Sequence, residues 1–163
     1  MIKTKQFLLV LILLISVAGY SQVIKGTYAI KNVETGVVIR VKDANGKNGT
    51  PMVAYNHINW KCMTWDFKHV DGNVYELKNL FTSKTFVQKE NSLEQVPVNS
   101  GNEDQQYEFI PSANKSYLIK LKNTELYLTS PKGTDIINEP IQLVKKNNGA
   151  LQQWVIIEQH PTM

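Results

Sequence analysis

The sequence predicts an all-β protein in which three related segments form one closed barrel. Three observations support this prediction: markers that recur about every 45 residues, apolar residues that alternate with polar ones, and turn-forming residues between the alternating stretches. Recurrence at a nearly fixed period is typical of repeat architectures, and alternation with a period of two is typical of half-buried strands. Three copies with room for about four short strands each fit a threefold barrel that is capped by hairpins.

Each copy carries the same three markers in the same order. The first marker is a strand-like segment that ends in asparagine, at Asn32, Asn79 and Asn123. The second is a proline that precedes apolar residues, at Pro51, Pro97 and Pro140. The third is a large aromatic residue that closes the copy, at Trp65, Tyr107 and Trp154. The copies are therefore expected to span about residues 26–67, 68–109 and 110–157.

Alternation of apolar and polar residues marks the expected strands within the copies. It is clearest at 37–42, 74–78, 117–122 and 126–129. Asparagine, aspartate and glycine cluster between such stretches, as at 43–46, 71–73, 100–102 and 147–149, and clusters of these residues form turns. After residue 21 no stretch has the three- and four-residue apolar spacing of a helix, which supports the all-β prediction.

The first 21 residues have the layout of a secretory signal peptide. Lys3 and Lys5 precede an unbroken apolar run from Phe7 to Ile15, and small residues follow it up to Ser21. The run is too short to span a bilayer comfortably. We therefore expect residues 1–21 to be removed, with the cleavage point known to within about two residues. The secreted mature chain, residues 22–163, is expected to form a single domain.

The charge and the cysteine content argue against several classes of protein. Without residues 1–21 the formal net charge falls from +4 to +2, which is too small for a nucleic-acid-binding face. Arg40 is the only arginine, although arginine is the residue that reads phosphate and guanine through paired hydrogen bonds. Cys62 is the only cysteine, so no intrachain disulfide can form and the fold depends on its hydrophobic core.

Several motifs together resemble the ricin B-type β-trefoil lectins. They are the segment 26–32, then Thr35-Gly36, then 49–53, and finally a closing Gln-x-Trp motif. That motif is intact at 152–154, nearly intact as Gln-Gln-Tyr at 105–107, and reduced to its tryptophan at 63–65. The resemblance covers residues from about 26 to 157. It implies a β-trefoil with pseudo-threefold symmetry, in which each of three repeats contributes about four strands.

The resemblance also implies a set of sugar-binding residues, although fold alone does not establish function. In ricin B-type lectins, each active copy offers an aspartate after an early strand and an aromatic ring beyond the proline, with asparagine or glutamine nearby. The aspartate holds two sugar hydroxyls, and the ring stacks on the sugar. At the aspartate position this sequence has Arg40, Val87 and Thr129. No copy carries the full set, which argues against the familiar arrangement for galactose.

The first copy nevertheless contains the best candidate group for a glycan pocket. Tyr55 falls at the stacking position and Asn56 follows it. Asp43 lies three residues after Arg40, in the same predicted turn. The alternative is a tyrosine that packs over a hairpin, with ordinary turn residues beside it.

Outside the first copy the candidates are weaker. Gln142 in the third copy is a possible contact, but a strand glutamine that faces solvent needs no function. Asn99 and Asp104 in the second copy fall in a stretch that reads as a polar loop. The closing rings are expected to fill the barrel core rather than to bind a ligand: Trp65, Tyr107 and Trp154.

Nothing in the sequence favours catalysis, a metal or a cofactor. His57 and Cys62 are close enough in the chain to form a nucleophilic pair, but no residue is placed to orient them. A lone cysteine near a core tryptophan is more often a small buried hydrophobic residue. His57, His69 and His160 lie in separate segments without the spacing of metal ligands. We therefore expect a protein that is not an enzyme and has no metal or cofactor.

The sequence thus predicts a secreted, lectin-like, ricin B-like protein that binds a carbohydrate or glycoconjugate weakly through hairpin-loop pockets. No nucleic acid and no membrane span are expected. The alternative is a β-trefoil protease inhibitor or protein-binding scaffold that acts through exposed loops on a protein partner. Convergence of Tyr55 and Asp43 on one shallow pocket would favour the lectin. A stiff loop tip at 56–61 with Trp60 exposed would favour the inhibitor.

Overall fold

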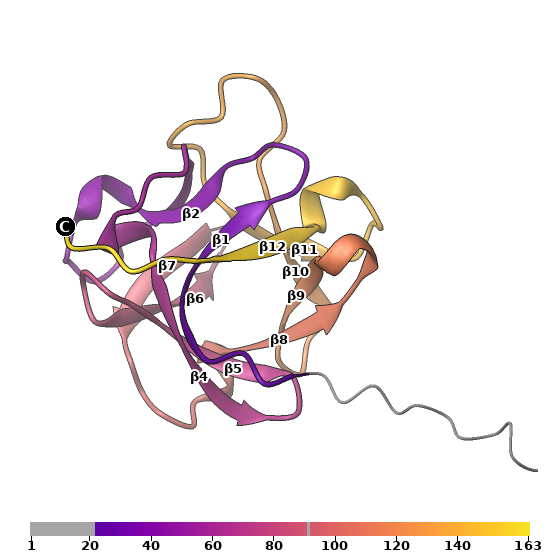
Figure 1. The fold of residues 1–163 in the computed structure, drawn as a ribbon, viewed down its shortest axis with the longest axis horizontal. Helices are drawn as coiled ribbons and strands as arrows, with labels where there is room; N and C mark the ends of the chain where they lie inside the picture. Colours follow the sequence, from indigo (N-terminus) through magenta and orange to yellow (C-terminus); the bar gives the residue numbers. More distant parts are fainter. Residues whose placement is uncertain (1–21, 91) are drawn as a thin grey trace, which may run out of the picture.

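The computed structural model of the chain describes residues 22–90 and 92–163. The predicted signal peptide, residues 1–21, lies outside the described residues. Within them the regular structure consists of twelve strands and five single-turn 3-10 helices, so the all-β prediction is confirmed (Figure 1). None of the helices in this part of the chain is long and apolar enough to cross a membrane.

The twelve strands divide in chain order into three units of four. Unit 1 contains β1 (Gly26–Asn32), β2 (Val38–Val41), β3 (Met52–Tyr55) and β4 (Trp65–Asp71). Unit 2 contains β5 (Val74–Asn79), β6 (Lys84–Lys89), β7 (Ser92–Pro97) and β8 (Gln106–Pro111). Unit 3 contains β9 (Tyr117–Leu121), β10 (Leu126–Thr129), β11 (Gln142–Lys145) and β12 (Trp154–Glu158). The 3-10 helices are η1 (Lys42–Ala44), η2 (Lys61–Met63), η3 (Glu103–Gln105), η4 (Ala113–Lys115) and η5 (Ala150–Gln152).

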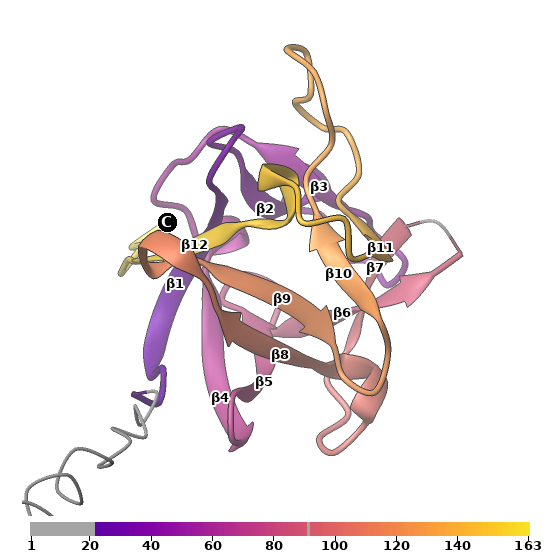
Figure 2. The same cartoon turned by 90° about the vertical axis from the view of Figure 1, so that its right-hand side faces the viewer.

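Six of these strands close into a barrel. β1 pairs with β4, β4 with β5, β5 with β8, β8 with β9, β9 with β12, and β12 with β1, all antiparallel. The other six strands form one hairpin per unit: β2–β3, β6–β7 and β10–β11. Figures 1 and 2 show the barrel and its hairpins from two directions. A six-stranded barrel with three hairpins is a β-trefoil, as the sequence predicts.

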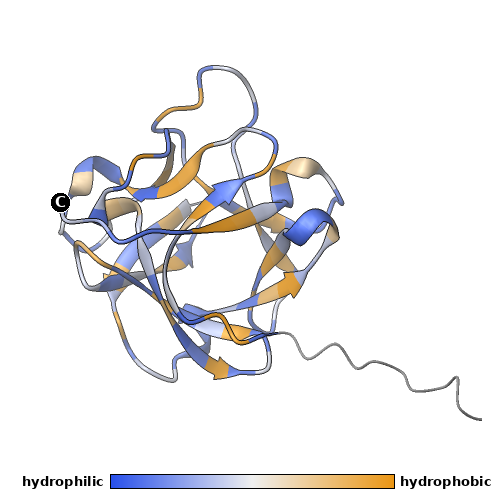
Figure 3. Ribbon diagram, in the orientation of Figure 1, coloured by the Kyte–Doolittle hydropathy of each residue, from blue (hydrophilic) through white to orange (hydrophobic). Residues whose placement is uncertain are grey.

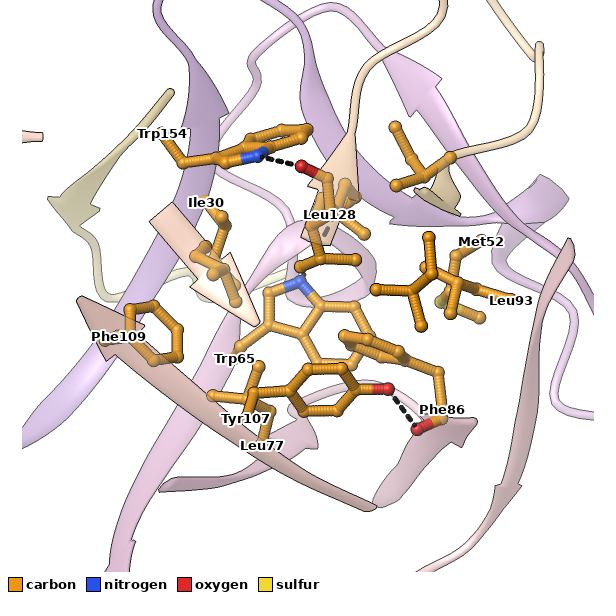
Figure 4. Packing of buried hydrophobic residues seen from close by; sticks show 14 of the residues in the cluster. Ile30, Met52, Trp65, Leu77, Phe86, Leu93, Tyr107, Phe109, Leu128 and Trp154 are labelled. Carbon is orange, nitrogen blue, oxygen red and sulfur yellow. Dashed lines mark hydrogen bonds between the residues drawn. The ribbon is translucent and has the colours of Figure 1, made fainter. Parts of the chain in front are cut away.

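One aromatic ring from each unit lies inside the barrel and ties the last strand of the unit to its hairpin. All three rings are 0 % exposed: Trp65, Tyr107 and Trp154. Each donates a hydrogen bond of 3.3, 3.0 or 2.9 Å to a backbone carbonyl of its own hairpin, and the acceptors are Ile39, Phe86 and Leu128 in that order. Figure 4 shows the second and third of these bonds within the packed core. Because its polar atom is hydrogen-bonded, each buried ring can contribute its full apolar area to the stability of the core.

The register of the barrel corrects the predicted repeat in unit 3. In the first two units the asparagine marker lies opposite a closing aromatic residue in the neighbouring strand, as Asn79 lies opposite Trp65. In unit 3 the residue that lies opposite Tyr107 in the neighbouring strand is Leu121. The predicted equivalence of Asn123 is therefore wrong by two residues. A search for asparagine could not find the true position because leucine has replaced it.

The asparagine marker has a structural role that explains its recurrence. The Asn32 side-chain oxygen accepts hydrogen bonds from the backbone of Glu34 and Thr35, each 3.1 Å long. The Asn79 side chain makes the equivalent bonds to Phe81 and Thr82. Side-chain amides of this kind hold a tight turn by replacing backbone partners.

The hairpin of unit 3 has a long connection, residues 130–141, which we call the 130–141 lobe. Its Asn138 N–H donates to the Ala54 carbonyl, and the Ala54 N–H donates to the Glu139 carbonyl, both at 2.9 Å. The lobe therefore covers the free edge of β3, which would otherwise present unpaired backbone groups. Ile136 from the lobe is buried in the main core. Figure 2 shows the lobe projecting from the barrel, and Figure 3 shows its hydrophobic stretch beside a hydrophilic tip.

Candidate functional site

The three hairpins place equivalent residues where the resemblance implies sugar contacts. Arg40, Val87 and Thr129 each follow the carbonyl that accepts the ring hydrogen bond, so they occupy the same place in their units. Their partners across the hairpins are Val53, Glu94 and Gln142. The residues two positions further along β3, β7 and β11 are Tyr55, Val96 and Val144. Only unit 1 has an aromatic ring there.

In unit 1 the Arg40 side chain occupies the position at which the resemblance implies a sugar. The Arg40 guanidinium lies 3.7 Å from the centre of the Tyr55 ring and covers one of its faces. The same guanidinium donates to Asp43 Oδ1 and Asn138 Oδ1, both at 3.0 Å. Arg40 is 6 % exposed, and its Nε has no hydrogen-bond partner among the described residues. Tyr55 and Asp43 therefore come together, but on Arg40 rather than around an open pocket.

The other two predicted residues lie elsewhere. Asn56 lines a separate hollow between unit 3 and unit 1. Gln142 is exposed on β11, where it pairs with Thr129. Of the three residues predicted to share a pocket in unit 1, Asp43 and Tyr55 therefore come together and Asn56 lies apart from them.

Unit 2 contains an open hollow of about 560 Å³, which we call the unit-2 hollow. Its apolar lining comes from Val87 on β6, Val96 and Pro97 on β7, and Leu121 on β9. Three of the polar side chains that line the same hollow belong to the segment between β7 and η3 or to η3 itself: Asn99, Asn102 and Asp104. The other polar lining residues are Gln88, Gln105 and Thr124. This volume suits a small ligand such as one or two sugar rings.

Gln105 fixes the loop that carries these polar groups. Its Oε1 accepts the Asn99 N–H at 2.7 Å, and its Nε2 donates to the Pro97 carbonyl at 3.1 Å. The Asn102 Oδ1 accepts the Asp104 N–H at 3.1 Å. The side chains of Asn99 and Asp104 make no hydrogen bond to other described residues, and both are exposed. Their carboxylate and amide groups are therefore free to bind a ligand.

A buried carboxylate beneath the same loop adds rigidity. Glu76 on β5 is 6 % exposed and accepts hydrogen bonds from the Gly101 N–H at 2.8 Å and from Lys68 Nζ at 2.9 Å. Burial alone would raise the pKa of Glu76, but the bonds from Gly101 and Lys68 outweigh it and lower that pKa. The carboxylate is thus held in its charged form, and the loop at 99–104 is anchored at both ends.

Asp104 lies close enough to the buried Tyr107 to influence its pKa. Burial raises the pKa of Tyr107 well above its ordinary value, and the Asp104 charge adds to this rise. The tyrosine hydroxyl therefore stays protonated and donates to the Phe86 carbonyl. The chemistry left for a ligand is an exposed carboxylate and two amides beside aliphatic side chains, which can accept and donate hydrogen bonds to hydroxyl groups.

The sequence contains only a weak signal for the unit-2 hollow. Asn99 and Asp104 both precede the Gln-Gln-Tyr motif, but they read as an ordinary polar loop. Val87 at the aspartate position argued against a sugar site in this copy. The structure shows that Val87, together with Val96 across the hairpin, forms part of the lining.

His57 and Cys62 do not face each other as a reactive pair. His57 Nε2 lies 2.9 Å from Gln159 Oε1. Cys62 is buried and packs with Ala29, Val38 and Met63, and this burial raises the pKa of its thiol. Among residues 22–90 and 92–163 no group of three or more histidine, cysteine or acidic side chains is placed to hold a metal ion.

The loop between β3 and β4 folds down onto the C-terminal segment. The Lys61 N–H donates to the Met163 carbonyl at 2.7 Å, and His57 contacts Gln159. Trp60 is half-buried and packs against the cluster around Cys62. The loop therefore does not present Trp60 as a freely projecting tip.

Known proteins resemble this chain in structure rather than in sequence. No protein-family model matches the chain, and no curated protein matches it. The designed threefold-symmetric protein ThreeFoil superposes with a TM-score of 0.75 at 16% identity, over 82% of this chain and 99% of its own. The ricin B-like lectin of Macrolepiota procera, solved with lactose, gives 0.69 at 23% identity, over 85% and 99%. The C-terminal half of the earthworm R-type lectin, solved with GalNAc, gives 0.63 at 16% identity, over 80% and 97%.

These likenesses extend over nearly the whole of each compared chain. At such low identities they establish the fold and leave the ligand open. They agree with the barrel, the three hairpins and the buried rings described above. The chain has the β-trefoil fold and is similar in structure to ricin B-like lectins.

Proposed function

We propose that the mature chain is a secreted, non-catalytic carbohydrate-binding protein that holds a glycan in the unit-2 hollow. The observation that carries this proposal is the grouping of Asn99, Asn102 and Asp104 beside the aliphatic side chains of that hollow. The fold shared with lectins solved with lactose and GalNAc supports it. The predicted signal peptide supports secretion.

The geometry suggests how a sugar would be held. The Asp104 carboxylate would accept hydrogen bonds from neighbouring hydroxyls, and charge-assisted bonds of this kind are the stronger ones. The amides of Asn99 and Asn102 would add a donor or an acceptor each. Val87 and Val96 would contact the apolar face of the pyranose ring. Because the loop is already anchored by Gln105 and Glu76, little ordering is needed on binding.

Affinity for a single sugar should be low. A monosaccharide offers few atoms, and its hydroxyls must give up their water. The lining of the unit-2 hollow includes no aromatic ring. Useful avidity would then come from several sites on one chain or from several chains on one glycan surface.

Affinity chromatography on immobilised sugars tests the proposal directly. We expect residues 22–163 to be retained on at least one matrix and released by the free sugar. Asp104→Ala should weaken retention about tenfold, because it removes the charged acceptor. Glu125→Ala is the matched control, since it removes one exposed acid outside the hollow.

Two outcomes would contradict the proposal. One is the absence of retention on every matrix, and the other is equal retention of wild type and Asp104→Ala. A panel of proteases serves as the counter-screen for the alternative function. Stoichiometric inhibition of any protease without sugar retention would favour the inhibitor.

A further inference from the structure

We propose a binding site for a small zwitterion, such as a free α-amino acid, in a hollow on the outer wall of the barrel. The hollow lies between the paired strands β4 and β5 and the segment 98–105, and we call it the wall hollow. Its volume is about 150 Å³, which corresponds to roughly five water molecules. Gln105 is the one residue that it shares with the unit-2 hollow. The inference does not depend on the proposed function.

Unit 1 and unit 2 differ at the positions that line the wall hollow. Glu76 lies three residues before the asparagine marker of unit 2, and Ala29 has the same place in unit 1. Thr85 directly precedes the carbonyl that accepts the ring hydrogen bond, and its counterpart is Val38. Ala29 and Val38 are buried in a small apolar cluster. Unit 2 therefore has a carboxylate and a hydroxyl where unit 1 has an apolar cluster.

Unit 3 resembles unit 1 at these positions. Leu118 is the counterpart of Glu76, because it lies three residues before Leu121, which faces the closing ring. Tyr127 is the counterpart of Thr85, because it precedes the acceptor carbonyl of Leu128. Both Leu118 and Tyr127 are buried. The barrel thus does not require polar groups here, and their burial in unit 2 alone, which is costly, points to a ligand.

The Thr85 hydroxyl is available to such a ligand. Thr85 is 2 % exposed and lines the wall hollow, and its Oγ1 has no hydrogen-bond partner among the described residues. A buried hydroxyl without a partner destabilises the fold. A ligand group that pairs with Oγ1 would recover that loss, which favours a ligand with a polar end.

Four charged side chains surround the wall hollow in an alternating pattern. Asp66 lies opposite Lys78, and Lys68 lies opposite Glu76, on the strands β4 and β5 that Figure 2 shows side by side. A ligand with a single charge would be attracted by two of these side chains and repelled by the other two. A zwitterion can place its ammonium near an acid and its carboxylate near a base at the same time.

The two ion pairs are not equally tight. Lys68 Nζ donates to Glu76 Oε2 at 2.9 Å and to Ser100 Oγ at 2.7 Å. Lys78 Nζ lies 3.7 Å from Asp66 Oδ2, which is beyond hydrogen-bond range, and both side chains are about half-exposed. Asp66 and Lys78 can therefore turn to hold an ammonium and a carboxylate, while Glu76 and Lys68 stay bound to the loop.

The apolar part of the lining limits the size of the ligand. Leu77 and Val98 contribute aliphatic surface to the hollow. With the volume given above, this surface leaves room for a small apolar substituent but not for a large side chain. An ammonium, a carboxylate and a small apolar group together make up a small α-amino acid such as alanine.

NMR titration of residues 22–163 labelled with ¹⁵N tests the inference, with L-alanine as the probe. L-Alaninamide keeps the ammonium without the carboxylate, and N-acetyl-L-alanine keeps the carboxylate without the ammonium. We expect the amides of Leu77, Thr85 and Val98 to shift saturably with L-alanine. The affinity for L-alanine should be about fivefold or more above that for either analogue.

Two variants check that the shifts report binding in the wall hollow. Thr85→Val keeps the shape of the side chain and should lower the affinity about fivefold or more. It should not lower the free energy of unfolding, because the hydroxyl has no partner to lose. Asp66→Asn should also weaken binding. Asp71→Asn, on the same strand but outside the hollow, is the matched control and should bind like the wild type.

The outcomes separate this inference from the proposed function. The absence of saturable shifts at the wall hollow, or equal affinity for L-alanine and its two analogues, would overturn it. Wild-type affinity in Thr85→Val would do the same, as would a loss of stability in that variant, which would assign the hydroxyl to the fold. Sugar retention and its loss in Asp104→Ala are measured separately, so either idea can fail while the other stands.

Discussion

Arg40 decides what unit 1 can do. It stands where the resemblance implies an acid for sugar hydroxyls, and it brings a buried positive charge instead. The guanidinium donates to Asp43 and Asn138 through Nη2 and covers the face of Tyr55, while its Nε has no partner among the described residues. A cation over an aromatic face contributes about 0.5–2 kcal/mol, more when desolvated. The same side chain therefore closes one pocket of the trefoil and braces the lobe that forms another.

The closing rings are where a single substitution should cost most. Trp154→Ala would remove a 0 % exposed ring and leave the Leu128 carbonyl without its donor. We expect the free energy of unfolding, measured by urea denaturation, to fall by about 3–5 kcal/mol. Phe81→Ala, at a residue that is 53 % exposed, is the control and should change it by less than about 0.5 kcal/mol. A near-neutral Trp154→Ala would mean that this ring does not support the barrel.

The ionisation of Glu76 should make the stability of the folded protein depend on pH. Its folded pKa is lowered from the ordinary value of 4.5, so its contribution is present above that value and is lost as the pH falls through the folded pKa. We expect wild type to be more stable than Glu76→Gln near neutral pH. The difference should shrink in acid, below about pH 4.

Denaturation series at several pH values measure this difference. Glu139→Gln, at an exposed acid on the lobe, is the control that removes the same charge without the buried hydrogen bonds. A stability difference for Glu76→Gln that stays constant from neutral to strongly acidic solution would argue that the carboxylate is not held in its charged form.

The hairpins and their connections give each unit its own surface. The barrel strands repeat closely, since each unit closes on a ring bonded to its own hairpin. The connections do not repeat, and the 130–141 lobe reaches as far as β3 of unit 1. Two hollows of similar volume therefore differ in chemistry because the segments that line them differ.

The buried glutamines link these connections to the barrel. Gln152 is 0 % exposed, accepts the Asn147 N–H at 3.0 Å and donates to the Lys145 carbonyl at 3.1 Å. Gln152→Ala would leave both backbone groups unpaired, and we expect a loss of about 1–3 kcal/mol in urea denaturation. Gln142→Ala, at an exposed glutamine of the same unit, is the control. Equal effects of the two variants would show that the buried amide does not hold the loop.

The sequence was sufficient for the elements but not for the sites. The fold could be predicted because the residues that fill the barrel interior can be recognised by their type. They are the apolar members of the alternating stretches and the recurring aromatic residues. The Asn123 marker failed because a side-chain turn signal can shift along the chain while the strand register stays fixed by the core. The direction of the Arg40 side chain and the reach of the lobe depend on contacts between units, such as that with Asn138, and no local pattern encodes them.

At the scale of the whole molecule, the trefoil has hollows of different chemistry around one barrel. Unit 1 is occupied by Arg40, unit 2 has an open polar hollow, and the lobe of unit 3 forms a more apolar one beside unit 1. The C-terminal segment adds to the cohesion of the barrel, since the Thr27 hydroxyl donates to the Gln159 carbonyl at 2.7 Å.

A glycan array probed with residues 22–163 tests the central claim, carbohydrate binding through the unit-2 hollow, most directly. Wild type, Asp104→Ala and Glu125→Ala are applied side by side at equal concentration. We expect wild type and Glu125→Ala to bind the same subset of glycans and Asp104→Ala to lose most of that signal. An array on which wild type binds nothing, or on which all three proteins bind alike, would contradict the account.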